Sequence, residues 1–181
     1  VVLAAEVIAR NPRPRRAEKF AEMVDLYSRQ PRLDVRTGSS RERQAYSTPA
    51  PLAYVVASIA AAGRDPRALR WLEPTAGTGQ LLVLAAPDKV DVGEIDPERA
   101  AFLRDGVGIP ASAVQEGDAT TMTWMRLDAD AVIGNPPFGL VREDGVGSAK
   151  RYTGPSGFRT THNDHAIMLR AMEGLKDDGV A

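Results

Sequence analysis

The sequence predicts an α/β fold in which a parallel sheet carries helices on both faces. Four short apolar runs, at residues 69–73, 90–95, 113–116 and 130–134, have the length of buried strands. Helical patterns at 79–86 and 97–105 separate the first three runs, and a polar or glycine-rich turn follows each run. This alternation is typical of right-handed βαβ units, whose strands are parallel.

Length and composition are typical of one soluble domain with a sizeable core. The chain has 181 residues, of which 43% are hydrophobic and 26% are charged. It has no cysteine and two histidines, so disulfides and thiolate metal sites are excluded and no metal site is expected. No apolar run approaches the roughly 20 residues of a membrane span, and no basic flank indicates a signal peptide. We therefore expect a cytoplasmic protein without membrane contacts.

The N-terminal part is expected to be a helical extension. Residues 1–43 are assigned to this helical segment and a basic linker, and residues 44–181 to the α/β domain. One helix is expected to bury a stripe of apolar residues at helical spacing, namely Ala17, Phe20, Ala21, Val24 and Tyr27. Residues 1–45 carry 10 Lys and Arg against 6 Asp and Glu, whereas the remainder carries 13 against 18. A basic front would suit a polyanion bound at one face, although a solvated helix face explains it equally well.

The first helix of the α/β domain is expected to begin at Thr48-Pro49. Thr48 would be the N-cap, Pro49 would take the first helical position, and Gly63 would end the helix. The expected buried residues of this helix are Leu52, Val55, Val56 and Ile59.

The last third of the chain is expected to hold a long loop and one more βα step. Residues 140–163 contain four glycines and are expected to form a mobile functional loop. Asp164 would cap a final helix, which would end before a turn at Asp178-Gly179. Val180-Ala181 would then begin a fifth strand, so that the sheet is truncated after about four to five strands.

A glycine-rich turn follows the first strand and is a candidate cofactor loop. Residues 73–79 read Glu-Pro-Thr-Ala-Gly-Thr-Gly, with only two of the three glycines of the dinucleotide fingerprint. A carboxylate at Glu73 would repel a pyrophosphate but would suit a cofactor with a positive amino group and a sulfonium. A plain tight turn is the alternative. The candidate cofactor-binding residues in this turn are Glu73, Thr75, Ala76, Gly77 and Gly79.

Acidic residues end the next two strands. Glu94 lies 94 − 77 = 17 residues after Gly77, near the spacing at which a carboxylate binds ribose hydroxyls in nucleotide folds. Ile95 could pack on a purine, and Asp96 could contact the cofactor while capping the helix from Pro97.

The third strand ends in Glu-Gly-Asp-Ala at residues 116–119. Asp118, with Ala119 beside it, could accept a hydrogen bond from an adenine amino group. At both strand ends, a solvated acidic turn or a helix cap is the alternative.

The run Asn135-Pro136-Pro137-Phe138 after the fourth strand is a candidate catalytic site. Its prolines fix φ and lack N–H groups, so backbone carbonyls can point outward without competing donors. The Asn135 side-chain oxygen and the Pro136 carbonyl could accept both hydrogens of one flat amine, which would free its lone pair. Phe138 could stack on the base that carries this amine. Together with the cofactor loop, the run indicates methyl transfer from S-adenosylmethionine to an exocyclic amine.

At this point the chain resembles the gamma-type DNA adenine-N6 methyltransferases. Five motifs occur in that family's order between residues 44 and about 139: residues 44–49, the turn at 73–79, and residues 94–97, 117–119 and 135–138. The resemblance implies a Rossmann-like methyltransferase fold that uses S-adenosyl-L-methionine. It also implies that Tyr46, Ser47 and Thr48 close over the methionine end of the cofactor.

The resemblance implies a substrate and partners as well. The substrate would be DNA, with direct transfer to a flipped adenine base. The wording of the motifs is similar to a methyltransferase module of phages and plasmids that is associated with strawberry-notch-type helicases. A helicase-like module is therefore an expected partner.

The chain also departs from the family pattern. The family continues through three more strands and a target-recognition region, so we expect the 181-residue chain alone to have little activity. The same four-residue run also serves methylation of glutamine amides in release factors and of RNA bases. A degenerate module that binds nucleic acid without activity is a further alternative.

Overall fold

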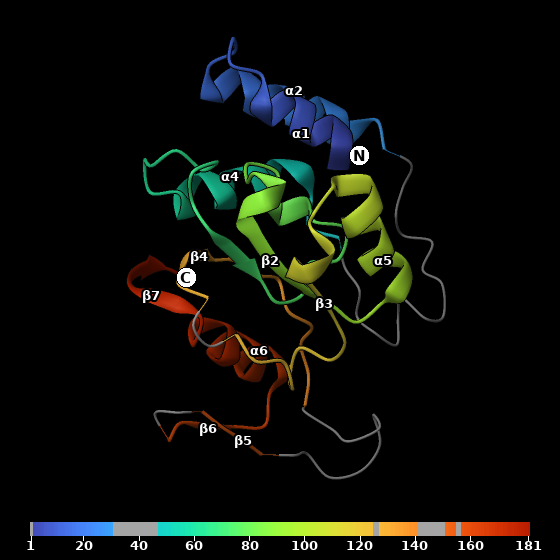
Figure 1. The fold of residues 1–181 in the computed structure, drawn as a ribbon. Helices are drawn as coiled ribbons and strands as arrows, with labels where there is room; N and C mark the ends of the chain where they lie inside the picture. Colours follow the sequence, from blue (N-terminus) through green and yellow to red (C-terminus); the bar gives the residue numbers. More distant parts are fainter. Residues whose placement is uncertain (1, 31–46, 125–126, 141–150, 155–156) are drawn as a thin grey trace.

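A computed structural model of the chain describes residues 2–30, 47–124, 127–140, 151–154 and 157–181. Its main sheet has five strands in the order β3-β2-β1-β4-β7, and all neighbouring pairs are parallel (Figure 1). The strands are β1 (Trp71–Glu73), β2 (Val90–Glu94), β3 (Val114–Glu116), β4 (Ala129–Val132) and β7 (Leu175–Val180). The predicted parallel α/β sheet is confirmed.

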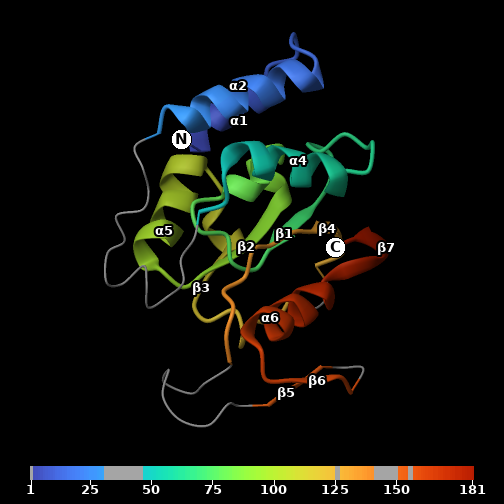
Figure 2. The ribbon, with the colours of Figure 1, turned by 180° about the vertical axis from the view of Figure 1, so that it is seen from behind.

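Helices cover both faces of this sheet, as predicted. On one face, α4 (Ala50–Ala60) and α5 (Pro97–Phe102) share an apolar cluster with Trp71. On the other face, α6 (Asn163–Met172) shares a second cluster with Leu72 and Trp124 (Figure 2). The neighbours Trp71 and Leu72 belong to opposite clusters because successive side chains of a strand point to opposite faces.

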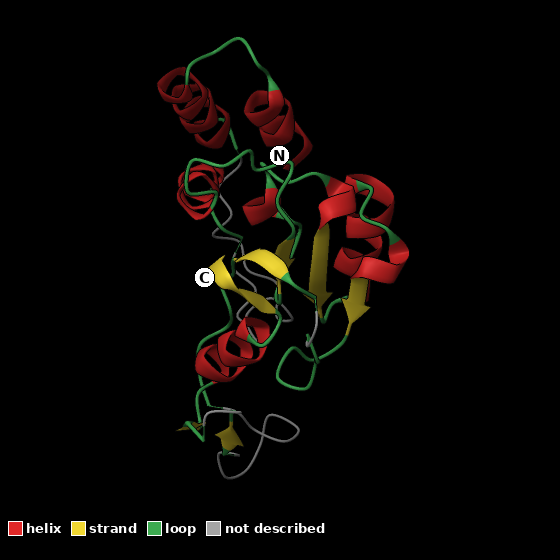
Figure 3. Cartoon of the chain, turned by 60° about the vertical axis from the view of Figure 1, so that its left-hand side comes forward, coloured by secondary structure: helices red, strands yellow, loops and turns green. Residues whose placement is uncertain are grey.

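Two helices precede the α/β domain, α1 (Val2–Arg10) and α2 (Arg16–Ser28), and both pack on α4 (Figure 3). The buried stripe predicted for the second helix is wrong. Phe20, Val24 and Tyr27 are exposed, whereas Met23 is fully buried in a cluster with Tyr54 of α4. The spacing of apolar residues does not by itself decide which face of this helix is buried. The contact with α4 buries the face that carries Met23.

The buried face predicted for α4 is wrong for three of its four residues. Leu52 and Val55 are exposed and Ile59 is 70% exposed, whereas Val56 is half-buried and packs against the cluster that contains Trp71. The buried positions are mostly alanines and lie at helical spacing, namely Ala50, Ala53, Tyr54, Ala57 and Ala60. Because α4 lies between the sheet on one side and α1 and α2 on the other, small side chains let it approach both.

Several boundaries differ from the expected ones. The helix expected at 79–86 is a single 3₁₀ turn, η1 (Gln80–Leu82). The helix expected at 97–105 consists of α5 followed by a π-helical turn, η3 (Leu103–Val107). Two further 3₁₀ turns, η2 (Pro87–Lys89) and η4 (Ala111–Ala113), lead into β2 and β3.

Two expected helix caps are each displaced. Pro49 rather than Thr48 is the N-cap of α4, and His162 rather than Asp164 is the N-cap of α6. The last strand, β7, starts at Leu175 and runs through the expected turn at Asp178-Gly179. The pairing with β4 is irregular here, because Ala129 pairs with Leu175 and Ala131 with Val180, so β7 bulges over the segment of the expected turn.

The segment predicted as one long loop at 140–163 contains a small hairpin. Strands β5 (Tyr152–Thr153) and β6 (Arg159–Thr160) pair antiparallel, and residues 141–150 and 155–156 lie outside the described part. The described part of the chain holds no helix that is both long and apolar enough to cross a membrane.

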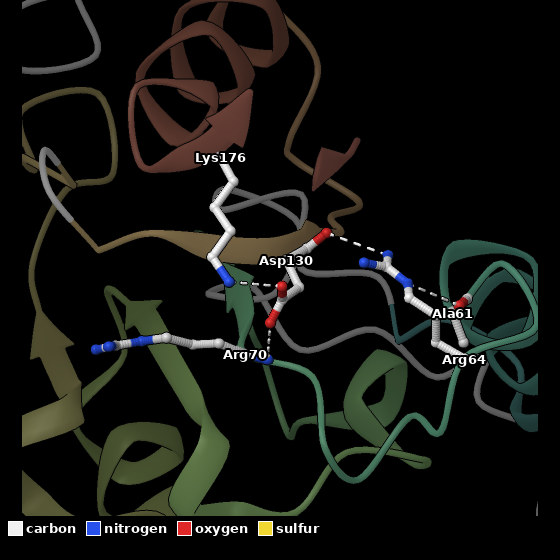
Figure 4. A network of polar contacts seen from close by, with 5 residues as sticks. All are labelled: Ala61, Arg64, Arg70, Asp130 and Lys176. Carbon is white, nitrogen blue, oxygen red and sulfur yellow. Dashed lines mark hydrogen bonds and ion pairs between the residues drawn. The ribbon is translucent and has the colours of Figure 1, made fainter. Parts of the chain in front are cut away.

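A polar network around Asp130 joins the starts of β1, β4 and β7 (Figure 4). Its carboxylate accepts from the Arg70 backbone N–H at 2.8 Å and from Lys176 Nζ at 2.7 Å, while Arg64 donates to its backbone carbonyl. The hydrogen bond from Arg70, with the nearby Lys176, lowers the pKa of Asp130. This network holds the amino ends of the three strands together. The candidate site lies at their carboxyl ends.

Candidate functional site

The candidate site lies where the strand order changes direction. In the sheet, β1 has β2 on one side and β4 on the other, so the loops after β1 and β4 diverge from neighbouring strands. Ligands of open α/β sheets bind at such switch points, outside the carboxyl ends of the strands. The glycine-rich turn follows β1 and Asn135 follows β4, so the topology places both at this point.

The glycine-rich turn has the backbone geometry that its sequence suggested. Gly77 and Gly79 have φ of +58° and +79°, a region that a side chain disfavours. The Ala76 N–H donates to the Gly93 carbonyl at 2.8 Å, and the Gly79 N–H donates to the Ala76 carbonyl at 2.8 Å. The turn is therefore closed on itself and fastened to β2.

Glu94 holds this turn through hydrogen bonds to the backbone. Its Oε2 accepts from the Gly77 N–H at 2.6 Å and its Oε1 accepts from the Asp96 N–H at 2.8 Å. The residue is only 6% exposed. Both carboxylate oxygens thus hold backbone, which makes Glu94 part of the frame of the site. Its expected contact with ribose hydroxyls stays a prediction.

An open hollow is lined in part by this turn. Seven of the predicted site residues line it: Ser47, Thr48, Glu73, Thr75, Ala76, Gly77 and Asn135. Sequence reasoning missed four others: Thr78, Gln80, Leu81 and Arg99. The structure therefore brings together the cofactor turn, the segment before α4 and the residue after β4, which are far apart in sequence.

Three side-chain atoms around this hollow are buried without a hydrogen-bond partner in the described part of the chain. They are Glu73 Oε2, Thr75 Oγ1 and Gln80 Nε2. Glu73 is 2% exposed and Gln80 is 7% exposed. A polar ligand in the hollow would satisfy these three atoms.

Glu73 has an electrostatic character suited to a cation. Burial raises the pKa of its carboxyl well above the ordinary value, and the neighbouring Glu94 raises it further. A positive group in the hollow would stabilise the ionised form. The residues present therefore fit a cofactor that carries an ammonium group.

Asn135 is held by a hydrogen bond to the segment before α4. Its Nδ2 donates to Thr48 Oγ1 at 3.3 Å, across 87 residues of sequence. Because Thr48 engages the nitrogen and no other described residue donates to the carboxamide oxygen, this oxygen can accept a hydrogen bond from a substrate. Thr48, displaced from its expected role as a helix cap, thus contributes to the site as a partner of Asn135.

The rest of the Asn-Pro-Pro-Phe run lies beside the hollow. Pro136 and Pro137 are half-buried, and Phe138 is 64% exposed. An exposed aromatic ring three residues after Asn135 is available for stacking.

The remaining predicted cofactor residues lie around the turn. Ile95 is exposed, and Asp96 caps α5 by accepting from the backbone N–H groups of Glu98 and Arg99. Asp118 is exposed and accepts from Thr120 within its own turn, while Ala119 is buried. Tyr46 lies outside the described residues.

Comparisons with known proteins agree with this fold. No family model matches the chain, and no curated protein matches it. Among solved structures, it is similar to a Pyrococcus horikoshii protein assigned as an RNA methyltransferase. The TM-score is 0.56 at 22% identity, over 87% of this chain and 70% of that one.

A second solved structure is the methyltransferase subunit of a type I restriction-modification system from Streptococcus thermophilus. The TM-score is 0.54 at 21% identity, over 75% of this chain. The chain matches 33% of the length of that subunit. These likenesses, with the parallel sheet, show that the chain has a Rossmann-like methyltransferase fold.

Proposed function

We propose that the chain transfers a methyl group from S-adenosyl-L-methionine to the exocyclic N6 amine of adenine in DNA. The observation that carries this proposal is the shared hollow of the glycine-rich turn and Asn135 at the switch point of the sheet. One side of the hollow offers an acid for a positive cofactor group, and the other offers a carboxamide oxygen for an amine.

The cofactor would be held by the residues that line the turn. Glu73 would accept from its ammonium group, Gly77 would let it approach the backbone, and Ile95 would pack on its adenine. Asp118 would accept from the adenine amino group, as the sequence resemblance implies. S-adenosylmethionine would supply an electrophilic methyl group to the amine lone pair, with the electrons of the C–S bond left on sulfur and a proton of the nitrogen released to water.

The substrate amine would be oriented by Asn135. Its Oδ1 would accept one N–H and the Pro136 carbonyl the other, while Thr48 keeps the carboxamide from rotating. Phe138 would stack on the flipped base, a contact worth roughly 1–3 kcal/mol. Correct placement of the amine can itself contribute about 7–11 kcal/mol of barrier reduction. No side chain is needed as a base before transfer.

The two similar structures do not agree on a substrate class. One is a subunit of a restriction-modification system, which favours DNA, and the other is assigned to RNA. Neither is described with a helicase, so that partner rests on the sequence resemblance alone. Methylation of RNA or of a glutamine amide, and binding without activity, are therefore kept as outcomes of the experiment.

The test uses cofactor carrying a tritiated methyl group at high enzyme concentration, because activity of this chain is expected to be low. Unmethylated DNA, RNA and a release factor are offered separately, and labelled nucleosides are identified by mass spectrometry. We expect N6-methyladenine in DNA and none above background with Asn135→Ala. Calorimetry with S-adenosylhomocysteine should give Asn135→Ala the affinity of the wild type, whereas Glu94→Ala should bind weakly.

Each other outcome contradicts the proposal in a defined way. Label in RNA or in the release factor would replace the substrate class. Cofactor binding without label in any acceptor would favour the inactive binding module. Equal loss of cofactor affinity in Asn135→Ala and Glu94→Ala would overturn the division of roles between the two strand ends.

A further inference from the structure

A second charged side chain lines the hollow and has no role in the proposed methyl transfer. Arg99 is in the first turn of α5 and lines the hollow together with Glu73. Its backbone N–H is bound by Asp96, but no hydrogen bond or ion pair joins its guanidinium to the described part of the chain. The charged lining thus consists of one acid and one base.

Gln80 adds an uncharged donor to the same lining. Gln80 lines the hollow and is only 7% exposed. Its Nε2 is buried and has no acceptor in the described part of the chain. Leaving such an amide group unpaired is unfavourable, because burial removes it from water without a replacement hydrogen bond. A ligand that carries an acceptor for Gln80 would remove this penalty.

We infer that Gln80 and Arg99 bind the carboxylate of the cofactor's amino acid end, while Glu73 binds its ammonium group. This inference rests on the proposed function and makes these two residues determinants of cofactor specificity. A carboxylate accepts hydrogen bonds and carries negative charge, so it can pair with the buried Gln80 amide and with the Arg99 guanidinium together. The hollow then selects an intact α-amino acid end over cofactor derivatives that lack the carboxylate.

The geometry explains why two donors of different type are present. Gln80 follows the glycine turn after β1, whereas Arg99 follows β2, so they reach the hollow from two adjacent βα units. Burial fixes the Gln80 side chain, which would therefore set the position of the carboxylate. The half-exposed Arg99 would supply the positive charge. Ser47, Thr48 and Thr78 are neutral, so no other described residue of the lining supplies a positive charge.

The experiment compares three ligands by calorimetry on the 181-residue chain. S-adenosylhomocysteine has both charges of the amino acid end, its decarboxylated analogue keeps only the ammonium group, and 5′-methylthioadenosine has neither. We expect the wild type to bind the first about 10- to 100-fold more tightly than the second, the range of a charge-assisted hydrogen bond.

Two variants and a control assign this preference to its residues. Gln80→Leu and Arg99→Met keep most of the side-chain volume and should each lower affinity for S-adenosylhomocysteine about 10-fold or more. Their affinity for the decarboxylated analogue should change by less than about twofold. Arg104→Met is the control, because Arg104 lies further along the same segment and pairs with Glu116 outside the hollow. It should leave all three affinities unchanged.

The outcomes separate this inference from the proposed function. Equal losses for both amine-bearing ligands would mean that Gln80 and Arg99 only shape the hollow, and would overturn the inference while leaving methyl transfer in place. If the wild type bound none of the three ligands, the proposed cofactor itself would be wrong. Thermal melting checks that each variant folds, and if Gln80→Leu does not, Arg99→Met decides the question. Loss of DNA binding by Arg99→Met with unchanged cofactor affinity would assign Arg99 to phosphate and also overturn the inference.

Discussion

Glu94 Oε2 accepts a 2.6 Å hydrogen bond from the backbone N–H of Gly77, and this contact joins the ends of β1 and β2. Its other oxygen accepts from the N–H of Asp96, where α5 begins. One buried carboxylate therefore sets the distance between the glycine turn and the next βα unit. The shape of the hollow depends on this relationship, because both segments contribute to its lining.

Replacing this carboxylate with an amide should weaken the frame. In Glu94→Gln, one oxygen becomes an NH₂ group that faces a backbone N–H, so a buried donor is left unpaired. We expect the free energy of unfolding to fall by about 1–3 kcal/mol, together with a loss of affinity for S-adenosylhomocysteine. Urea denaturation and calorimetry measure the two effects. Glu116→Gln, at an exposed carboxylate paired with Arg104, is the control, and equal behaviour of the two variants would contradict the prediction.

Glu73 should give stability a defined dependence on pH. Burial and the nearby Glu94 raise the pKa of its carboxyl well above the ordinary value of 4.5. The folded chain then holds this proton at pH values where the unfolded chain has released it. The contribution of Glu73 to stability is therefore complete below about pH 4.5 and is lost as pH rises through the folded-state pKa.

The measurement is the difference in free energy of unfolding between the wild type and Glu73→Gln, which cannot ionise. As pH rises from about 4.5 towards 8, the wild type should lose stability relative to the variant. Urea denaturation at intervals across this range gives the difference directly. A difference that stays constant with pH would show that burial of Glu73 does not perturb its ionisation.

Thr48 should act on catalysis by positioning Asn135. Thr48→Val keeps the shape of the side chain but removes the acceptor of the 3.3 Å hydrogen bond from Asn135 Nδ2. We expect kcat to fall about 2- to 10-fold, the range of one neutral hydrogen bond, because the carboxamide can then rotate. Thr48→Ser retains the hydroxyl and should restore kcat. A purely structural role would instead lower thermal stability and cofactor affinity in both variants alike.

The strands and the convergence of the site could be predicted from the sequence. Short apolar runs that alternate with turns define a parallel sheet, and parallel strands present their carboxyl ends at one edge. This argument alone places the glycine turn near Asn135, and in the structure both line one hollow. No side-chain detail was needed, because topology determines which loops meet.

The helix faces and the remaining lining residues could not be predicted in this way. Leu52 and Ile59 attract attention because they are large, yet α4 buries its alanines, since close packing on two sides favours small residues. Gln80 stands before two leucines in a run that indicates only a core helix, and Arg99 resembles any solvated helix residue. Their place in the hollow depends on how two βα units pack together, which local patterns do not encode.

Gly93 offers a test of how closely the turn is packed on β2. A Cβ added there would lie 2.5 Å from the Pro74 carbonyl oxygen and 2.7 Å from Met122 Sδ, so the turn would have to move. We expect Gly93→Ala to lower the free energy of unfolding by about 1–3 kcal/mol and to weaken binding of S-adenosylhomocysteine. Urea denaturation and calorimetry measure both effects.

The matched control is Gly154→Ala, because an added Cβ there comes no closer than 3.8 Å to the described residues that surround it. Stability of this variant should stay within about 0.5 kcal/mol of the wild type, with unchanged binding. If Gly93→Ala matched the control in stability and affinity, the turn could shift freely on β2. The hydrogen bonds from Ala76 to Gly93 and from Gly77 to Glu94 would then not hold the cofactor loop in place, and the frame inferred for the site would be wrong.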